Sequence, residues 1–120
     1  MTRILVVEDT PDNRQILRDL LTSAGYEVVE AFNGAEGVAA AIEHLPDLIL
    51  MDIQLPVLDG YEATRRIKAN AATAKIPIIA VTSYALSGDE TKAREAGCDG
   101  YVAKPFSPRQ LLARVREFLQ

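Results

Sequence analysis

The sequence has a single cysteine, no long apolar run and no excess of basic residues. Cys98 has no partner for a disulfide within the chain, which favours a reduced, cytoplasmic setting. No run approaches the roughly 20 apolar residues that a membrane-spanning helix needs, and Met1 leads into a strand-like segment rather than a secretory signal. The 13 basic and 17 acidic side chains give a net charge of -4. That balance argues weakly against a surface that binds nucleic acid or a membrane, so we expect neither partner.

Internal repeats, low-complexity tracts and linkers rich in proline, glycine or serine are also lacking. The 120 residues are enough for one domain and leave little over for a second. Hydrophobic residues make up 48% of the chain, which supplies a real core and is too many for a disordered segment. We therefore expect residues 1–120 to fold as one domain.

Short apolar runs are spread along the chain, at residues 4–7, 26–31, 48–51, 76–81 and 101–103. The first, third and fourth are almost continuously apolar, which is typical of parallel strands buried on both faces. The run at 26–31 alternates with glutamates, which predicts an edge strand.

Apolar residues recur at helical spacing in the segments that follow these strands: 16–24, 38–45, 59–69, 87–96 and 111–119. Thr10 before Pro11 predicts a capping hydroxyl followed by a first-turn proline. Three pairs have the spacing of a capping box: Asn33 with Glu36, Ser87 with Glu90, and Ser107 with Gln110.

The helix predicted over 87–96 differs from the others because its apolar face consists mostly of Ala93 and Ala96. Such a face buries little area, so we expect this helix to be held loosely. It is either an ordinary surface helix, which the sequence alone slightly favours, or a mobile element of a switch.

Strict alternation of five strands and five helices predicts an α/β fold with right-handed crossovers, a (βα)5 doubly wound domain of the flavodoxin-like type. The expected five-stranded parallel sheet has the order 2-1-3-4-5. Its binding crevice lies beyond the carboxyl ends of the strands, near the strands at 4–7 and 48–51.

Polar side chains follow these strands at that edge: Glu8 and Asp9, Asp52, Thr82, and Lys104. Crowded carboxylates repel one another unless a cation or a proton intervenes. Oxygen ligands of this kind suit Mg²⁺, which takes one or two carboxylates and keeps several waters.

Each of these residues also has an ordinary structural explanation. Asp9 is as readily a helix cap as a metal ligand, Lys104 taken singly is best explained as a surface lysine, and Thr82 suits a strand. Asp52 is harder to explain in this way, because an acid after a core-bound strand is unfavourable without partners. The coincidence of all of them at one end of the sheet indicates a functional site.

Five short motifs occur in order along the chain and together are typical of a known family: 7–9 (Val-Glu-Asp), 50–56 (Leu-Met-Asp-Ile-Gln-Leu-Pro), 59–60 (Asp-Gly), 80–82 (Ala-Val-Thr) and 104–105 (Lys-Pro). Over essentially its whole length the chain resembles the receiver domain of two-component response regulators, including the single-domain chemotaxis and cell-cycle types. The resemblance implies that Asp52 accepts a phosphoryl group from phosphohistidine, forming an acyl phosphate.

The resemblance also implies the roles of the other site residues. Asp9 ligates Mg²⁺ with help from Glu8, and Asp52 and the backbone carbonyl of Gln54 complete the protein ligands. Lys104 pairs with Asp52 before the reaction and with the phosphoryl group after it, and a cis peptide before Pro105 directs its ammonium inward. Thr82 donates its hydroxyl to a phosphoryl oxygen.

A switch follows from the same resemblance. Thr82 moves toward the phosphoryl group, Tyr101 fills the vacated space, and the face formed by the 87–96 helix, the last strand and the last helix changes. Ordinary packing explains Tyr101 equally well. The implied partners are a sensor histidine kinase or a histidine phosphotransfer protein, and a downstream effector protein. The chain is then a phosphoacceptor that promotes its own phosphorylation and dephosphorylation rather than an enzyme, and it is a monomer or a phosphorylation-dependent dimer.

Three other functions fit less well. A flavin-binding protein needs a phosphate loop rich in serine, threonine and glycine after the first strand, where this chain has Glu8 and Asp9. An aspartyl-phosphate phosphatase has a second acid two residues after the first, where this chain has Gln54. A degenerate receiver that only binds proteins lacks some of the pocket residues, all of which this chain has.

Overall fold

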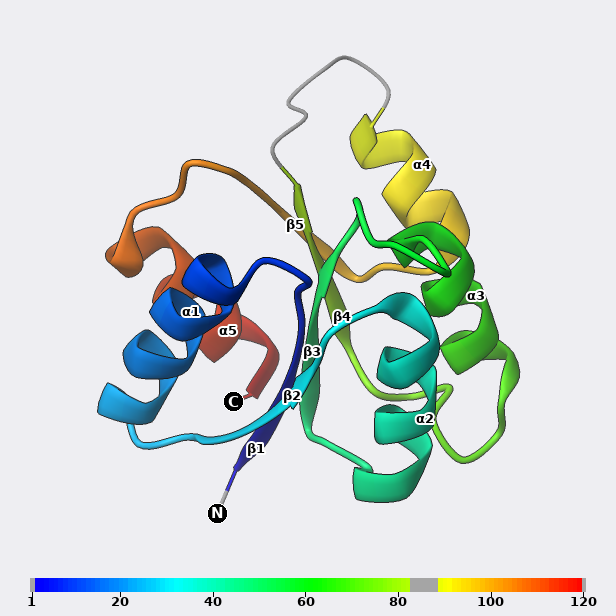
Figure 1. Ribbon diagram of the computed structural model, residues 1–120, viewed down its shortest axis with the longest axis horizontal. Coiled ribbons are helices and arrows are strands. Elements are labelled where there is room, and N and C mark those ends of the chain that lie inside the picture. The colour runs from blue at the N-terminus through cyan, green and yellow to red at the C-terminus, as the bar shows by residue number, and fades with distance from the viewer. Residues whose placement is uncertain (1, 83–88, 120) are drawn as a thin grey trace.

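The chain folds into a parallel sheet with helices on both faces, as a computed structural model describes for residues 2–82 and 89–119 (Figure 1). The strands are β1 (Arg3–Val7), β2 (Glu27–Ala31), β3 (Leu48–Asp52), β4 (Ile78–Thr82) and β5 (Gly100–Ala103). The helices are α1 (Pro11–Ser23), α2 (Gly34–His44), α3 (Gly60–Ala69), α4 (Asp89–Ala96) and α5 (Pro108–Leu119).

The strands pair in parallel in the order β2-β1-β3-β4-β5, which confirms the predicted topology. Figure 1 shows α1 and α5 on one face of the sheet and α2, α3 and α4 on the other. The order reverses between β1 and β3, because β2 lies outside β1 while β4 and β5 lie beyond β3. Both strands therefore open onto the crevice that this topology creates at their carboxyl ends.

Burial along the strands follows the sequence pattern. Every residue of β3 and β4 is buried, and so are residues 4–7 of β1. Most of β2 is only half-buried, as expected for the edge strand that its alternating sequence predicts. None of the helices in the described ranges has the length and apolar content that crossing a bilayer requires.

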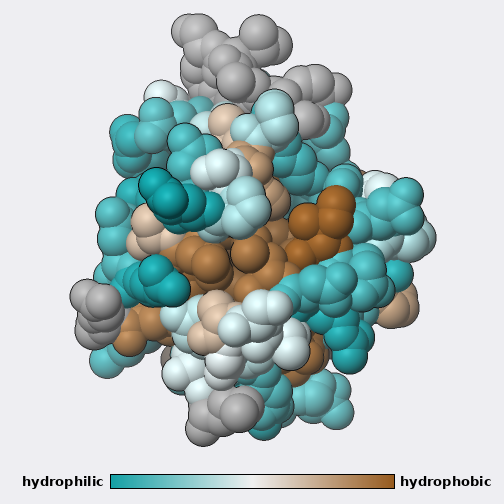
Figure 2. Space-filling model, turned by 90° about the vertical axis from the view of Figure 1, so that its left-hand side faces the viewer, coloured by the Kyte–Doolittle hydropathy of each residue, from teal (hydrophilic) through white to brown (hydrophobic). Residues whose placement is uncertain are grey.

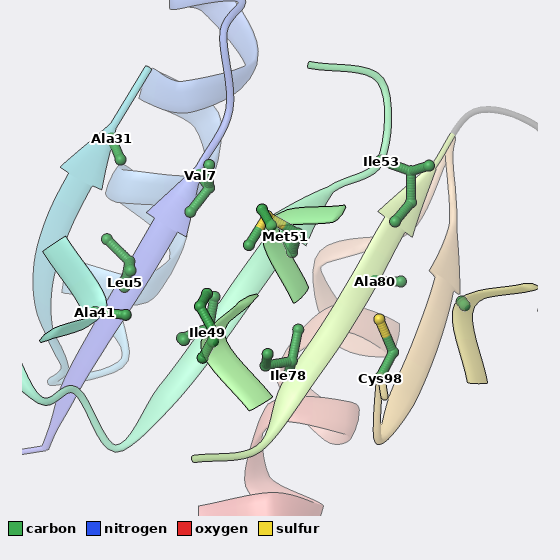
Figure 3. Packing of buried hydrophobic residues seen from close by; sticks show 13 residues of the cluster. Leu5, Val7, Ala31, Ala41, Ile49, Met51, Ile53, Ile78, Ala80 and Cys98 are labelled. Carbon is green, nitrogen blue, oxygen red and sulfur yellow. The ribbon is translucent and has the colours of Figure 1, made fainter. Parts of the chain in front are cut away.

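Side chains that alternate along the strands supply two apolar cores, one on each face. Leu5 and Val7 join the cluster under α2, α3 and α4, together with residues of β3 and β4 (Figure 3). Ile4 and Val6 join the second cluster, which Leu17 and Leu21 of α1 and two residues of α5 complete. Helices therefore pack against both faces of the buried strands, and this packing fixes the positions of their carboxyl ends.

Two of the predicted capping boxes lie in the described part of the chain. Asn33 Oδ1 accepts a hydrogen bond of 2.8 Å from the Glu36 amide at the start of α2. At α5, Ser107 Oγ accepts from the Gln110 amide at 3.1 Å, and Gln110 Oε1 accepts from the Ser107 amide at 3.2 Å. The third box begins at Ser87, outside the described residues.

Two expectations for α1 are wrong. Within the described chain, the Thr10 hydroxyl makes no capping hydrogen bond, and the Thr10 amide donates to Glu8 Oε2 at 3.1 Å instead. Ile16, the first residue of the apolar helical pattern predicted over 16–24, is 58% exposed rather than buried. Leu17 and Leu21, one turn apart, already form the buried stripe, which leaves Ile16 at its margin.

The last turn of α4 is tied to its surroundings through the residues that follow it. Ala93 and Ala96 are buried, as their spacing predicts. Beyond them the Asp99 amide donates to the Ile78 carbonyl at 2.7 Å, and the Asp99 carboxylate accepts from the Ile78 amide at 2.9 Å. The same carboxylate oxygen lies 2.9 Å from Lys68 Nζ on α3. This end of α4 is therefore fastened to both β4 and α3.

Candidate functional site

Strand register brings the predicted site residues to one edge of the sheet. Val7 pairs with Met51, so Glu8 follows β1 beside Asp52 at the end of β3. Asp52 pairs with Val81, which puts Thr82 at the end of the next strand. Thr82 in turn pairs with Ala103, and its carbonyl accepts a hydrogen bond of 2.7 Å from the Lys104 amide.

Three carboxylates form a cluster at this edge. Glu8, Asp9 and Asp52 each offer an oxygen, and these oxygens lie within 4.8 Å of one another. Glu8 and Asp52 are 1% and 6% exposed, whereas Asp9 is exposed. The donor set fits a hard divalent cation, and the open side at Asp9 leaves room for the waters that Mg²⁺ retains.

Lys104 lies nearer to Glu8 than to Asp52. Its Nζ is 2.8 Å from Glu8 Oε1 and 3.5 Å from Asp52 Oδ2, so the expected pairing with Asp52 is the longer of two contacts. Glu8 is the more buried acid and has the greater need of a counter-charge. Asp52 also accepts a hydrogen bond at Oδ1 from the Gln54 amide, at 3.1 Å. The peptide between Lys104 and Pro105 is cis.

Burial raises the pKa of Asp52 to about 7, and the hydrogen bond and negative charge of Glu8 act in the same direction. Burial also acts to raise the pKa of Glu8, but its hydrogen bonds with Asp52, Lys104 and the Thr10 amide outweigh this and hold it below its usual value. Burial acts to lower the pKa of Lys104, and the two acids reverse this, so that it lies above its usual value. Glu8 and Lys104 are therefore an ion pair, while Asp52 exchanges a proton near neutral pH.

The remaining predicted residues flank this cluster. Thr82 is 1% exposed at the end of β4. Gln54 is exposed, and its amide faces Asp52 through the hydrogen bond already described. Tyr101 is half-buried on β5 and packs against the cluster under α4. Both interpretations of Tyr101, packing and switching, are compatible with this position.

The roles of three residues around the site were not predicted from the sequence, although Gly60 lies in one of the family motifs. A Cβ at Gly60 would lie 2.3 Å from the Asp52 carbonyl oxygen, so glycine is required where α3 begins against β3. Val57 has φ +69°, and the Leu58 amide donates across it to the Pro56 carbonyl at 2.7 Å in a tight turn. Pro56 and the Asp-Gly pair signal a turn here, but they do not say which residue takes the left-handed conformation.

The third missed residue is Arg14, one turn into α1. Its Nη1 donates to the Glu8 carbonyl at 3.1 Å and to the Asp9 carbonyl at 3.5 Å. An arginine near the start of a helix carries no signal that it turns back toward the preceding loop.

A doubly wound domain with an acid cluster, a hydroxyl and an ammonium at the switch point of its sheet has the design of a phosphoacceptor. The chain matches the response regulator receiver domain family over residues 4–116. It belongs to this family, whose members are phosphoacceptor switches of two-component systems.

Relatives and solved structures agree. The polar-differentiation response regulator DivK of Brucella anthropi is 42% identical over 116 residues, which cover 97% of this chain and 94% of that protein. The receiver domain of sensor histidine kinase PA1611 from Pseudomonas aeruginosa has a TM-score of 0.93 and 42% identity, covering 98% of this chain and 97% of that one. Its crystal structure has a magnesium ion coordinated in the active-site cleft. The chemotaxis protein CheY4 of Vibrio cholerae also has a TM-score of 0.93, at 30% identity and 98% coverage of both chains.

Proposed function

We propose that residues 1–120 form one receiver domain, that Asp52 takes a phosphoryl group from a phosphohistidine, and that Mg²⁺ assists the transfer. The observation that carries this is the setting of Asp52. It is nearly buried, its Oδ1 accepts the Gln54 amide, and its Oδ2 lies 3.5 Å from an ammonium at the mouth of an acid cluster.

The proposed metal ligands are Glu8, Asp9, Asp52 and the backbone carbonyl of Gln54. Support comes from the clustered carboxylate oxygens and from the magnesium in the cleft of the PA1611 receiver domain. When bound, Mg²⁺ supplies positive charge that offsets the negative charge of the acceptor and of the phosphoryl oxygens.

The chain's own residues then do the following. A carboxylate oxygen of Asp52 attacks phosphorus, the new O–P bond forms as the N–P bond to histidine breaks, and the imidazole leaves with the bonding electron pair. Lys104 pairs with the negative oxygens of the phosphoryl group, and the Thr82 hydroxyl donates to one of them. Asp52 must be ionised to attack, and a pKa of about 7 leaves this carboxyl ionised in about half of the molecules at pH 7.

We further propose that the domain promotes its own phosphorylation and dephosphorylation and turns over no separate substrate. The same groups that neutralise charge in the forward transfer would neutralise it when water attacks the acyl phosphate. A reduced, cytoplasmic location is consistent with the buried, unpaired thiol of Cys98.

The phosphohistidine donor is proposed to dock beside α1. A hollow of about 450 Å³ lies there, lined by Asn13, Ile16, Leu17, Lys104, Pro105 and Phe106. Figure 2 shows the side of the molecule that carries α1 and α5, with apolar side chains gathered at its centre and polar ones around them. The hollow shares Lys104 with the acceptor site, so a helix carrying phosphohistidine would fit against exposed Ile16 while its ring reaches Asp52. A sensor kinase or a histidine phosphotransfer protein has this chemistry.

The face of α4, β5 and α5 is proposed to pass the signal to an effector protein, or to a second copy of the chain. Tyr101 lines two hollows on this face, one of about 150 Å³ toward α4 and one of about 510 Å³ toward α5. We propose that the Tyr101 ring turns toward one of these hollows when Thr82 moves toward a phosphoryl group.

The acceptor is tested by incubating the protein with Mg²⁺ and acetyl phosphate or phosphoramidate and measuring its mass. We expect a single phosphoryl adduct that hydroxylamine removes. Asp52→Asn should abolish the adduct, whereas Asp12→Asn, which alters an exposed acid at the start of α1, should keep it. An adduct that persists in Asp52→Asn would assign the acceptor to another residue.

The donor surface needs a separate test, because small donors bypass it. Ile16→Ala should slow transfer from a phosphorylated histidine phosphotransfer domain without changing the rate with acetyl phosphate. Ile42→Ala removes a similarly exposed isoleucine from α2 and should change neither rate. Equal transfer rates for the two variants would refute docking at α1.

A further inference from the structure

We propose that Arg14 is a positioning residue for the metal site, holding the two adjacent acids that follow β1 in the arrangement that grips the cation. This inference rests on the proposed function, because it concerns the affinity of the same acid cluster for Mg²⁺. It adds a residue that does not itself touch the metal or the phosphoryl group.

The contacts of Arg14 are to the backbone of the acids rather than to their carboxylates. Nη1 donates to the carbonyl oxygens of Glu8 and Asp9, at 3.1 and 3.5 Å. Bridging two successive carbonyls from one guanidinium restrains the peptide between them, and that peptide sets the relative directions of the two side chains. Arg14 itself therefore occupies no carboxylate oxygen of the cluster.

Glu8 is restrained at each of its other polar groups. Its amide donates to the Ala31 carbonyl at 3.0 Å, its Oε1 meets Lys104 and its Oε2 accepts the Thr10 amide. Asp9 is exposed, and its carbonyl contact with Arg14 ties it to this well-held neighbour. Arg14 thus restrains the exposed Asp9 relative to the buried Glu8.

The guanidinium is itself held in place from the far side. It stacks over the Phe32 ring, with Cζ 4.1 Å from the ring centroid, and its Nε lies 3.5 Å from Glu30 Oε2. Only 16% of its side chain is exposed. A planar group stacked on one face and ion-paired at one edge loses little freedom on binding the carbonyls.

The sign of the change in Mg²⁺ affinity distinguishes a positioning role of Arg14 from a simple effect of its charge. A bare cation close to the acids would repel Mg²⁺, so removing it would strengthen metal binding. If Arg14 acts by positioning, removing it weakens metal binding although a positive charge has gone. The two roles therefore predict opposite changes.

The test is a Mg²⁺ titration at constant ionic strength and pH 8, followed by the amide NMR shifts of Thr10 and Gln54. We expect Arg14→Met to weaken binding about tenfold, as loss of a residue that orients metal ligands typically does. Arg14→Lys keeps the positive charge but not the planar guanidinium that donates to both carbonyls, so its Mg²⁺ affinity should lie between those of Arg14→Met and the unsubstituted protein. Arg18→Met removes the arginine that contacts Glu30 at 2.8 Å one turn further along α1, and should bind Mg²⁺ as the unsubstituted protein does.

A stability control separates positioning from general loosening. Leu21→Ala weakens the core under α1 without touching the loop, so it should leave Mg²⁺ affinity unchanged. If Arg14→Met fails to fold, Phe32→Leu decides instead, since it removes the stacking surface and should give a smaller loss in the same direction.

Unchanged or tighter binding in Arg14→Met, or in Phe32→Leu where that variant decides, overturns the inference while the proposed function stands. So does an equal loss in Leu21→Ala. An unsubstituted protein that does not bind Mg²⁺ at all overturns both.

Discussion

The interior of this molecule stabilises the fold, whereas its functional edge, where the strands end, lowers the stability of the fold. In the interior, apolar side chains of β1, β3 and β4 are almost wholly buried between two helical layers. At the carboxyl edge, Glu8 and Asp52 share one buried space, and Val57 has a left-handed backbone that β-branched residues rarely adopt. Packing in the interior stabilises the fold, whereas the charges and backbone conformation of the edge destabilise it. This is expected where a site is arranged to bind a ligand that is present only part of the time.

The largest effect should come from breaking the interior. Leu21→Ala removes a fully buried side chain of α1 and should lower the free energy of unfolding by about 3 kcal/mol. Urea denaturation measures the loss. Ile16→Ala, on the same helix but 58% exposed, should lose far less. Similar losses for both would mean that the core under α1 is not packed as described.

At the edge, a substitution should raise the free energy of unfolding rather than lower it. The pKa of Asp52 is about 7 in the folded protein and 3.8 in its reference state, so the folded chain holds a proton that the unfolded chain has released. Stability from this group is present at low pH and is lost as the pH rises toward 7. Asp52→Asn removes the ionisable group and should be more stable than the unsubstituted protein by about 2 kcal/mol at pH 8, after allowance for its lost contact with Lys104.

Urea denaturation at several pH values tests that prediction. The gap between Asp52→Asn and the unsubstituted protein should shrink steadily from pH 8 to pH 5. A gap that is independent of pH would show that Asp52 titrates normally.

Metal binding should relieve the repulsion at the edge. Mg²⁺ binds ionised carboxylates, so protonation of Asp52 below its pKa competes with it. The apparent affinity should therefore fall about tenfold between pH 8 and pH 6, as an NMR titration would measure. Residual binding by Asp52→Asn should lack most of this dependence, and an equal dependence in both proteins would shift the cause to another group.

The smallest effect should come from the backbone of the edge. Val57 is 83% exposed and has φ +69°, so its side chain contributes little packing to offset its conformation. Val57→Asn should raise stability by about 1 kcal/mol, because asparagine tolerates the left-handed region. Val57→Ala lacks the polar group with which asparagine hydrogen-bonds locally in this conformation, so it should gain much less. A loss in Val57→Asn would mean that the valine contacts stabilise the loop.

The sequence was sufficient to predict the fold and most of the candidate site. Continuous apolar runs distinguish β1, β3 and β4 from the edge strand β2, and the alternation of elements leaves one favoured order for the sheet. Because parallel strands end at the same edge, the residues after them had to meet. The sequence therefore groups Glu8, Asp52, Thr82 and Lys104 at this edge.

What escaped prediction depends on choices between near-equal neighbours. Lys104 has two acids within reach, and its closer contact with Glu8 depends on how deeply each acid is buried. Thr10 has the pattern of a cap, but its amide is engaged by the same glutamate. Arg14 turns back along the chain to carbonyl groups that every residue has, so no side-chain pattern could reveal it.

The fastening of α4 through Asp99 limits how this helix can move. Because the chain just beyond its last turn is bonded to β4 and through Lys68 to α3, we expect α4 to pivot about residues 97–99 rather than to slide along the sheet. Its displacement then grows with distance from that pivot, so the largest movement falls on the end that follows β4 and Thr82. A small displacement at the phosphoryl site would in this way produce a larger displacement of α4 at the surface. Amide hydrogen exchange along α4 should therefore slow from residue 90 toward residue 98.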